Sequence, residues 1–586
     1  MANNPRTNLP VTIDTLKFVG EIADWSWTPV AAVRQAQDQT AEPGEGSLNQ
    51  VGIWKRTRRD FILGAGQEHA DEQESSDLRY NTSIGLDPWD DRKLKLLNDT
   101  SQRKSTAATS AELVAVDDRI YWNDGGTIRH DTSPDTGGFT STVTGSGYTS
   151  MTHYGDKVYA CDGSDIYTIT DGSRASFSTY NADMVLYGNG RLVAADANEL
   201  VEIDSGGTSA AIFTHPNTTF VWRGGVATPQ GIYVFGDSGG TTEIYFIGII
   251  DADTSLAAPF TAAPLTPNEQ VNVMYHYGGV IVMGTNRGFR LSTATGVGHL
   301  TYGPLIEISG GVNDFAGDGE DLWFTWGNYD GVNGGLGRTR LDRFTDTLVP
   351  RYATDLMAAN TGASLAVTSY GSKRYFVLSG DGLYSEASTK VAQGIYNSGW
   401  ITYGTPELKG FRSLDLRHGA LPAGASIVGK IIEDDATTTT VVTSSTTGAL
   451  GAVADVSGTI EKEAVQVRIE VNRATDTSAD VEFRRWTVRS IPMPYRSSQI
   501  VLALQLRAET VQRRATVKLD PLTEWNALRT LEKSRSVISV TIGDWTGSAY
   551  VDGVGFEEGD LTEWPRDQAW PEGVVRVRLI TVESTS

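Results

Sequence analysis

Two motifs known from hydrolases are the first candidates for chemistry in this sequence. The segment Gly236-Asp237-Ser238-Gly239-Gly240 has the G-x-S-x-G pattern, which in hydrolases places a nucleophilic serine on a turn between a strand and a helix. Strand-like residues both precede it, at 232–235, and follow it, at 242–250, so we predict an ordinary glycine-rich hairpin turn instead. The seven histidines are scattered, with no H-E-x-x-H motif and no close pair, and we therefore expect no zinc-hydrolase site.

The carboxylates are a further candidate for chemistry. Glycoside hydrolysis needs only two carboxyl groups a few ångströms apart, one of them with a raised pKa. A chain with 72 Asp and Glu residues leaves this reaction open. Asp318-Gly319-Glu320-Asp321 is similar to the Asp-box turns of sialidases, but Glu320 stands where that motif has glycine, so we interpret it as a turn between strands. No segment has the spacing of a calcium-binding loop, and we expect no catalytic residue, metal site or cofactor.

One loop has the composition of a ligand-binding loop. Residues 326–337 combine two aromatic side chains that can stack on sugar rings with amide and carboxylate groups that can bond hydroxyls. The candidate ligand-binding residues are Trp326, Asn328, Tyr329, Asp330 and Asn333. The alternative is an elaborated loop that contacts a neighbouring subunit.

Charge and cysteine content exclude several classes of protein. The formal net charge of −23 repels phosphate backbones and anionic lipid headgroups, so we expect no nucleic-acid partner. Cys161 is the only cysteine, which rules out an intrachain disulfide. The polar N-terminus has no apolar segment of the kind found in signal peptides, and no apolar run approaches the length of a membrane span. We expect a protein made in the cytoplasm and not inserted in a membrane.

A repeated hairpin organises the middle of the chain. Between about 113 and 396 a polar turn followed by an apolar, aromatic strand recurs seven times at spacings of about 40 residues, the size of a propeller blade. Abundant glycine, tyrosine and tryptophan also favour many short strands. We predict an all-β protein with a β-propeller of about seven blades at 111–395, and the alternatives are a β-helix or stacked sandwiches.

Three other regions flank the predicted propeller. Residues 1–110 are interpreted as an N-terminal arm with outer strands. Alternation in 465–471 favours a β-sandwich at 396–492. A small α+β domain is predicted at 493–586, where Asp520-Pro521 can begin a helix and leucine and tryptophan follow at spacings of three.

Several segments resemble the minor tail proteins of long-tailed phages that infect actinobacteria. The similarity is carried by Trp54-Lys55-Arg56-Thr57-Arg58-Arg59-Asp60-Phe61, by Gly64-Ala65-Gly66-Gln67, by 79–89 with its Asp87-Pro88-Trp89, by 398–404 with Lys409 and Phe411, and by Val551-Asp552-Gly553-Val554. These segments together span most of the chain, and none is a catalytic signature. The resemblance implies a structural protein of the virion at the tail tip or baseplate.

The resemblance also implies partners and a role. The partners would be the tail hub, the distal tail protein or other minor tail proteins, together with glycan of the host envelope, and the protein would form a homo-oligomer because tails have rotational symmetry. Its role would be host recognition or adsorption and scaffolding, without enzymatic activity. The alternative is a propeller enzyme that cleaves cell-wall polysaccharide, for which the fold alone is no argument.

Overall fold

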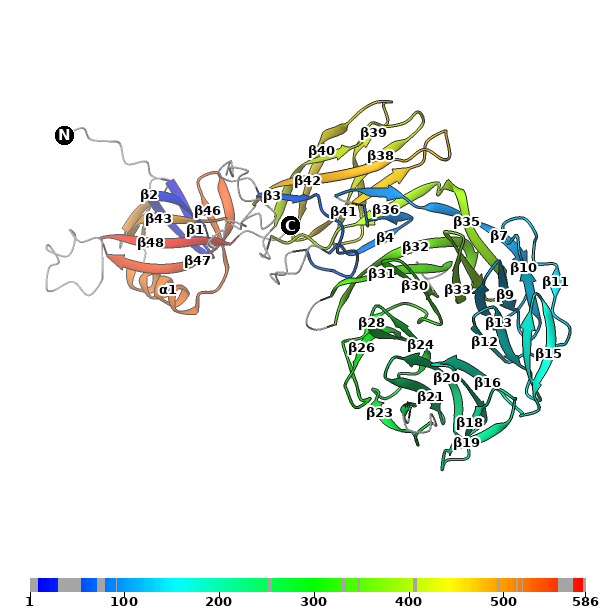
Figure 1. The fold of residues 1–586 in the computed structure, drawn as a ribbon. Helices are drawn as coiled ribbons and strands as arrows, with labels where there is room; N and C mark the ends of the chain where they lie inside the picture. The colour runs from blue at the N-terminus through cyan, green and yellow to red at the C-terminus, as the bar shows by residue number, and fades with distance from the viewer. Residues whose placement is uncertain are drawn as a thin grey trace.

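The computed structural model describes residues 9–29, 54–70, 79–90, 92–249, 256–327, 333–344, 348–403, 408–492, 496–506, 509–512, 515–518, 520–556 and 573–582. Within these residues nearly every element is a strand, and α1 (Pro521–Ser534) is the one helix. Figure 1 shows the propeller, the sandwich beside it and a small barrel. The predicted all-β class and the predicted propeller and sandwich are confirmed.

The middle of the chain folds into antiparallel sheets of four or five strands, seven of them in the described residues. Each repeated hairpin of the sequence supplies the second strand of one sheet and the turn before it. The first four sheets contain β8 (Glu112–Val116), β9 (Arg119–Asn123), β10 (Ile128–Asp131) and β11 (Ser141–Thr142); β12 (Ser150–Tyr154), β13 (Lys157–Cys161), β14 (Ile166–Thr170) and β15 (Ser173–Ser178); β16 (Met184–Gly188), β17 (Arg191–Asp196), β18 (Glu199–Ile203) and β19 (Ser209–Thr214); and β20 (Val221–Thr228), β21 (Gly231–Asp237), β22 (Thr242–Gly248) and β23 (Phe260–Pro264).

The next sheets complete the ring, and the last of them is closed by a strand from the N-terminal side. They contain β24 (Val271–Tyr277), β25 (Val280–Thr285), β26 (Gly288–Ala294), β27 (Leu300–Tyr302) and β28 (Ile306–Glu307); β29 (Phe315–Asp318), β30 (Asp321–Trp326), β31 (Asn333–Phe344) and β32 (Pro350–Thr361); and β33 (Ser364–Tyr370), β34 (Lys373–Leu378), β35 (Gly382–Lys390) and β7 (Asn98–Ser105). Strand β7 pairs with β35, so the two ends of the propeller segment lie in one sheet.

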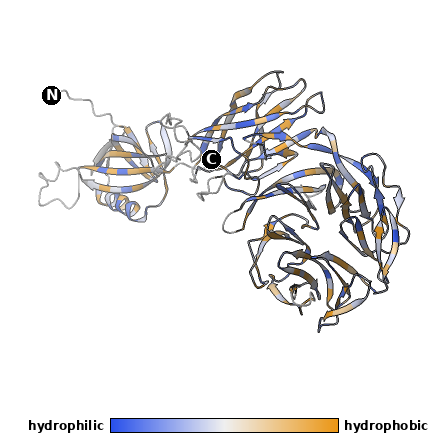
Figure 2. Ribbon diagram, in the orientation of Figure 1, coloured by the Kyte–Doolittle hydropathy of each residue, from blue (hydrophilic) through white to orange (hydrophobic). Residues whose placement is uncertain are grey.

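The first strands of these sheets surround a common axis. Each first strand contacts the next in the order β8, β12, β16, β20, β24, β29 and β33, and β33 in turn contacts β8. The second strands, such as β17, β21, β25, β30 and β34, are buried at consecutive residues and so on both faces, because the sheets pack side by side, whereas the outer strands β15 and β19 are largely exposed. The large side chains of Trp122, Trp222, Tyr233 and Tyr375 are fully buried in this way. Figure 2 shows the alternation of hydrophobic and hydrophilic residues along the strands.

The sandwich combines strands from both sides of the propeller. Its sheets contain β3 (Trp54–Arg58), β4 (Thr82–Ile84), β5 (Leu86–Asp87), β6 (Leu94–Leu96), β36 (Gln393–Asn397), β37 (Lys409–His418), β38 (Ser426–Glu433), β39 (Thr438–Ser444), β40 (Gly451–Lys462), β41 (Val465–Asn472) and β42 (Glu482–Pro492). β3 and β6 pair with β42, and β4 pairs with β36. The domain therefore begins well before residue 396, the boundary that the sequence suggested.

A closed barrel joins the two ends of the chain. Its strands are β1 (Leu9–Ile13), β2 (Leu16–Pro29), β43 (Arg496–Leu506), β46 (Ile538–Ile542), β47 (Trp545–Phe556) and β48 (Gly573–Val582), with a separate hairpin of β44 (Glu509–Gln512) and β45 (Ala515–Lys518). β2 pairs with β43 and β1 with β46. This corrects the prediction of one N-terminal arm at 1–110, because β1 and β2 cover strand edges that the C-terminal strands would otherwise expose.

Helix α1 begins as the sequence predicts. The Asp520 carboxylate accepts hydrogen bonds from the backbone N–H groups of Leu522 and Thr523, both at 3.2 Å, and Pro521 occupies the first turn. Leu528 is fully buried against the barrel. Trp525 and Leu531, at the predicted spacing of three, pack partly buried against the same core. Leu522 is 37% exposed, because each step of three residues turns the side chain further from Leu528 around the helix.

Candidate functional site

The loop that the sequence singled out is only partly described. Trp326 ends β30, and its ring stacks on Phe324 with centroids 5.7 Å apart, against a buried cluster of the propeller. Asn333 begins β31 and pairs with Thr361. Asn328, Tyr329 and Asp330 lie outside the described residues. The described ends of the loop are thus part of the propeller framework, and ligand binding by the loop stays a prediction.

An open space lies on the axis of the propeller. A channel of about 610 Å³ is lined by the first strands of the sheets. Neighbouring first strands run in the same direction, since the Val185 N–H donates to Ser150 Oγ at 3.5 Å and the Tyr187 N–H donates to Thr152 Oγ1 at 3.2 Å. The channel therefore has one end formed by strand starts and another formed by strand ends.

The end formed by strand starts carries two carboxyl groups. Glu112 begins β8 and Asp314 immediately precedes β29, and both line the channel. Burial raises the pKa of Asp314 to about 7. Burial also raises the pKa of Glu112 to about 7, with a smaller contribution from the charge of Asp314. Each side chain keeps some accessible surface through the channel, but protein atoms replace most of the water around it.

Asp314 connects two neighbouring sheets through its hydrogen bonds. Asp314 Oδ2 accepts from the Val367 N–H at 2.9 Å, across to the next sheet, and Oδ1 accepts from the Phe315 N–H at 2.8 Å. Ser150 and Thr152 accept backbone N–H groups from the next sheet in the same manner. First strands of neighbouring sheets do not form a ladder with one another, so these side chains satisfy N–H groups that would otherwise be unpaired.

The opposite end of the channel is lined by histidine and tyrosine. His153, Tyr187, Tyr275 and His276 come from the last residues of β12, β16 and β24. Burial lowers the pKa of His153, although its ring is accessible from the channel, so this imidazole is neutral at pH 7. A second cavity of about 230 Å³ adjoins this end, because His276 lines both spaces. This end offers hydrogen-bonding groups and aromatic rings.

The described residues hold no group of three or more histidine, cysteine, aspartate or glutamate side chains that could bind a metal ion. Within the same residues no helix is long and apolar enough to cross a lipid bilayer. The predicted hairpin turn at Ser238 is confirmed, since Asp237 pairs with Thr242 across it. Asp318 pairs with Asp321 in the same way, which confirms the blade-turn interpretation of that segment.

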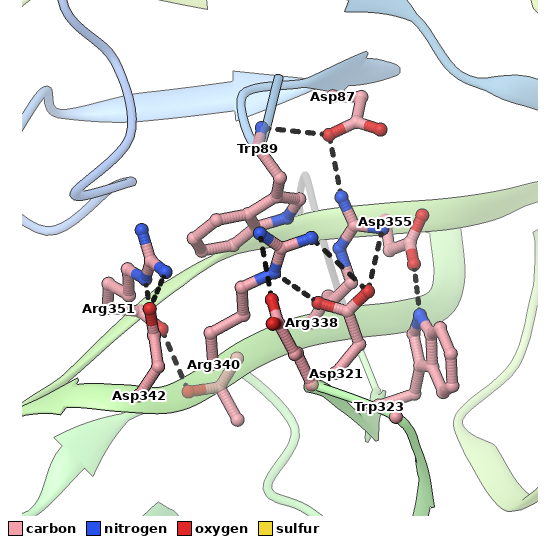
Figure 3. Close-up of polar contacts among 12 residues, drawn as sticks. Asp87, Trp89, Asp321, Trp323, Arg338, Arg340, Asp342, Arg351 and Asp355 are labelled. Atoms are coloured by element: carbon pink, nitrogen blue, oxygen red, sulfur yellow. Dashed lines mark hydrogen bonds and ion pairs between the residues drawn. The ribbon is translucent and has the colours of Figure 1, made fainter. Parts of the chain in front are cut away.

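A second polar cluster joins the sandwich to the propeller (Figure 3). The ring of Trp89 has the guanidinium carbons of Arg338, Arg340 and Arg351 at 5.3, 5.5 and 5.5 Å from its centroid. Arg340 Nε lies 2.5 Å from an Asp321 oxygen, and Arg351 pairs with Asp342. Each cation has a carboxylate partner, so the cluster holds two domains together and has no unbalanced charge to offer a ligand.

Sequence reasoning missed the channel residues. The pattern H-E-x-x-H tests only for histidines that are close in the chain, whereas the propeller brings His153 and His276 from two different sheets to one channel. Glu112 and Asp314 are two of 72 acidic residues, and nothing local distinguishes them. A signal did exist in their position, because each lies at the start of the strand before a repeated hairpin.

Comparisons with known proteins give structural neighbours only. No protein-family model matches the chain, and no curated protein matches it. Among solved structures, a streptogramin B lyase is 13% identical with a TM-score of 0.32, covering 56% of this chain and 94% of its own. BamB from Moraxella catarrhalis is 11% identical with a TM-score of 0.32, covering 49% of this chain and 96% of its own. The computationally designed Ika8 protein is 10% identical with a TM-score of 0.33, and the match covers 56% of this chain and 99% of the designed chain.

Proposed function

We propose that the protein is a structural and recognition component of a phage tail tip or baseplate, in which a rigid propeller is presented on a scaffold of sandwich and barrel. The observation that carries the proposal is the nesting of the three domains. Strands from the first 105 residues complete the barrel, the sandwich and the last propeller sheet. Because of this nesting, two chain segments connect the barrel to the sandwich and two connect the sandwich to the propeller, so a pulling force between domains is divided between two connections.

The residues behind the phage resemblance support the same proposal. Gly64 lies against the backbone of Tyr352 in β32, where the Ala65 N–H donates to the Tyr352 carbonyl at 2.8 Å. A Cβ at Gly64 would come within 2.0 Å of that carbonyl oxygen, and its φ of +74° also favours glycine. Asp87 and Trp89 belong to the cluster that joins sandwich and propeller. The resemblance therefore rests on residues that build the scaffold.

The proposal places the protein in the virion tail as a homo-oligomer, in contact with the tail hub, the distal tail protein or other minor tail proteins. Its test is mass spectrometry of purified particles together with the native mass of the isolated chain. We expect the protein in particles in a fixed ratio to the tail-tube protein, and a closed oligomer in solution or in the particle. Absence from particles would overturn the proposal.

Glycan cleavage is the second candidate function, and one observation favours it. Two carboxyl groups with raised pKa values lie in one channel, as a glycosidase requires of its acid catalyst. Against it, both oxygens of Asp314 already accept backbone hydrogen bonds. The test is release of reducing ends from cell-wall polysaccharide. Release that Glu112→Gln abolishes would favour the enzyme, and no release above buffer would dismiss it.

A further inference from the structure

Three tyrosines form a stack beside the histidine end of the channel. The rings of Tyr154 and Tyr187 are 4.3 Å apart with an interplanar angle of 20°, and those of Tyr159 and Tyr187 are 5.5 Å apart with an angle of 17°. Tyr187 also lines the channel. Tyr154 is 57% exposed, so one face of its ring is supported by Tyr187 while much of the side chain is open to solvent. An exposed ring held in this way can bind a flat apolar surface with little loss of side-chain entropy.

The face of the propeller around this stack is defined by seven turns, and we call it the turn face. These turns join the first and second strands of the sheets, at 117–118, 155–156, 189–190, 229–230, 278–279, 319–320 and 371–372. They contain four carboxylates, Asp117, Asp118, Asp156 and Glu320, and no lysine or arginine. Of the four cations that directly follow these turns, Arg119, Arg191 and Lys373 are paired with carboxylates, and Lys157 is exposed beside Asp156. The turn face therefore repels anionic polymers.

The smaller cavity opens on the same face. It is lined by the turn that contains Gln230, by His276 and Gly279 of the β24–β25 hairpin, and by Thr228 and Thr293. Hydroxyl, amide and imidazole groups of this kind bond sugar hydroxyls, and the cavity is small, at about 230 Å³. Because His276 also lines the axial channel, the cavity adjoins the channel at its histidine end, where Tyr187 of the stack also lines the channel.

We propose that the turn face binds an uncharged glycan, with a sugar ring stacked on Tyr154 and hydroxyls bonded at the channel mouth and in the smaller cavity. Sugar rings have an apolar face for stacking and hydroxyl groups at their edges, which matches an aromatic platform beside neutral donors and acceptors. The carboxylates of the turns disfavour phosphorylated or carboxylated polymers. The inference names a partner class for the proposed recognition function and rests on it for its biological setting.

The test uses the full-length protein on an array of defined uncharged hexose and pentose oligosaccharides, together with the same backbones carrying phosphate or carboxylate groups. We expect binding to at least one uncharged series, weakened at least about 10-fold by Tyr154→Ala and changed less than about 2-fold by Tyr154→Phe, which keeps the ring. Phe260→Ala is the matched control, since Phe260 is also an exposed aromatic residue, at 38%, but lies on the outer strand β23.

Three outcomes would overturn the inference: no binding to any uncharged glycan, tighter binding to the anionic series, or binding that Tyr154→Ala leaves unchanged. If Tyr154→Ala does not fold, Gln230→Trp replaces it, because this exposed turn residue would fill the smaller cavity without altering the core and should weaken binding similarly. The result is distinguishable from the test of the proposed function, because a protein found in particles can still fail to bind any glycan on the array.

Discussion

Asp87 of the sandwich and Arg338 of the propeller are joined by a hydrogen bond of 2.6 Å between Asp87 Oδ1 and Arg338 Nη2. Arg338 is 7% exposed and also lies 3.6 Å from Asp321, beneath the ring of Trp89. A guanidinium so far from water needs its carboxylate partners, because an uncompensated buried charge is strongly destabilising. This contact makes the junction between the two domains sensitive to single substitutions.

We expect Trp89→Ala to destabilise the protein by about 3 to 5 kcal/mol, because it removes the ring that three guanidinium groups contact. We expect Asp87→Asn to destabilise it by about 1 to 3 kcal/mol, because it removes the charged hydrogen-bond partner of Arg338. Differential scanning calorimetry and hydrogen exchange of β31 and β32 would measure the effect. Glu307→Gln is the control, since Glu307 is 73% exposed in its ion pair with Arg287 and should contribute about 0 to 1 kcal/mol. Equal effects of Trp89→Ala and Glu307→Gln would contradict the structural role of the cluster.

The carboxyl groups of the channel predict a pH dependence of stability. The pKa of Asp314 rises from 3.8 to about 7 on folding, so the folded protein holds this proton more tightly than the unfolded chain does between those values. The free energy of unfolding should therefore fall as the pH rises from about 4 to about 7, and the Glu112 carboxyl contributes in the same direction. Loss of the proton leaves a carboxylate in a site with little water.

Asp314→Asn removes that titration and should reduce the fall in stability between pH 5 and 8 by about 1 to 2 kcal/mol, after allowance for water in the channel. Chemical denaturation at each pH would measure it. Asp156→Asn, at an exposed turn, is the control and should leave the pH profile as in the wild type. A profile for Asp314→Asn that runs parallel to the wild-type profile would refute the raised pKa.

The closed barrel predicts that the first strands of the chain are essential to the last ones. Val11 is 1% exposed inside the barrel, and Val19 of the same hairpin is 45% exposed on its outside. We expect Val11→Asp to unfold the barrel, at a cost of several kcal/mol for a buried charge, and Val19→Asp to change stability by less than about 0.5 kcal/mol. Hydrogen exchange at Leu502 and Val540 would report the opening. If the amides of Leu502 and Val540 exchange equally slowly in both variants, Val11 does not belong to the core.

How far the sequence predicts this structure depends on how local each signal is. The repeated hairpins are local, since a turn and its two strands are adjacent in the chain, and they indicate the propeller correctly. The pairing of β2 with β43 joins residues at opposite ends of the chain, and the residues of a strand do not identify a partner strand that is distant in the sequence. The channel residues are a similar case, because His153 and His276 meet only when separate sheets close around the axis. Helix α1 was predictable for the opposite reason, since its cap lies beside its first turn.

The single cysteine offers a test of propeller packing. Cys161 ends β13 and is fully buried, and burial raises the pKa of its thiol to about 12. Almost no thiolate is present at pH 8, and a disulfide reagent reacts only with an accessible thiolate. We expect the native protein to react at least about 100-fold more slowly than the protein unfolded in guanidinium chloride. Ser164→Cys in a Cys161→Ala background is the control, because Ser164 is exposed in the turn that follows β13 and should react rapidly in the native state. Native Cys161 reacting as fast as this control would mean that the second sheet of the propeller opens freely.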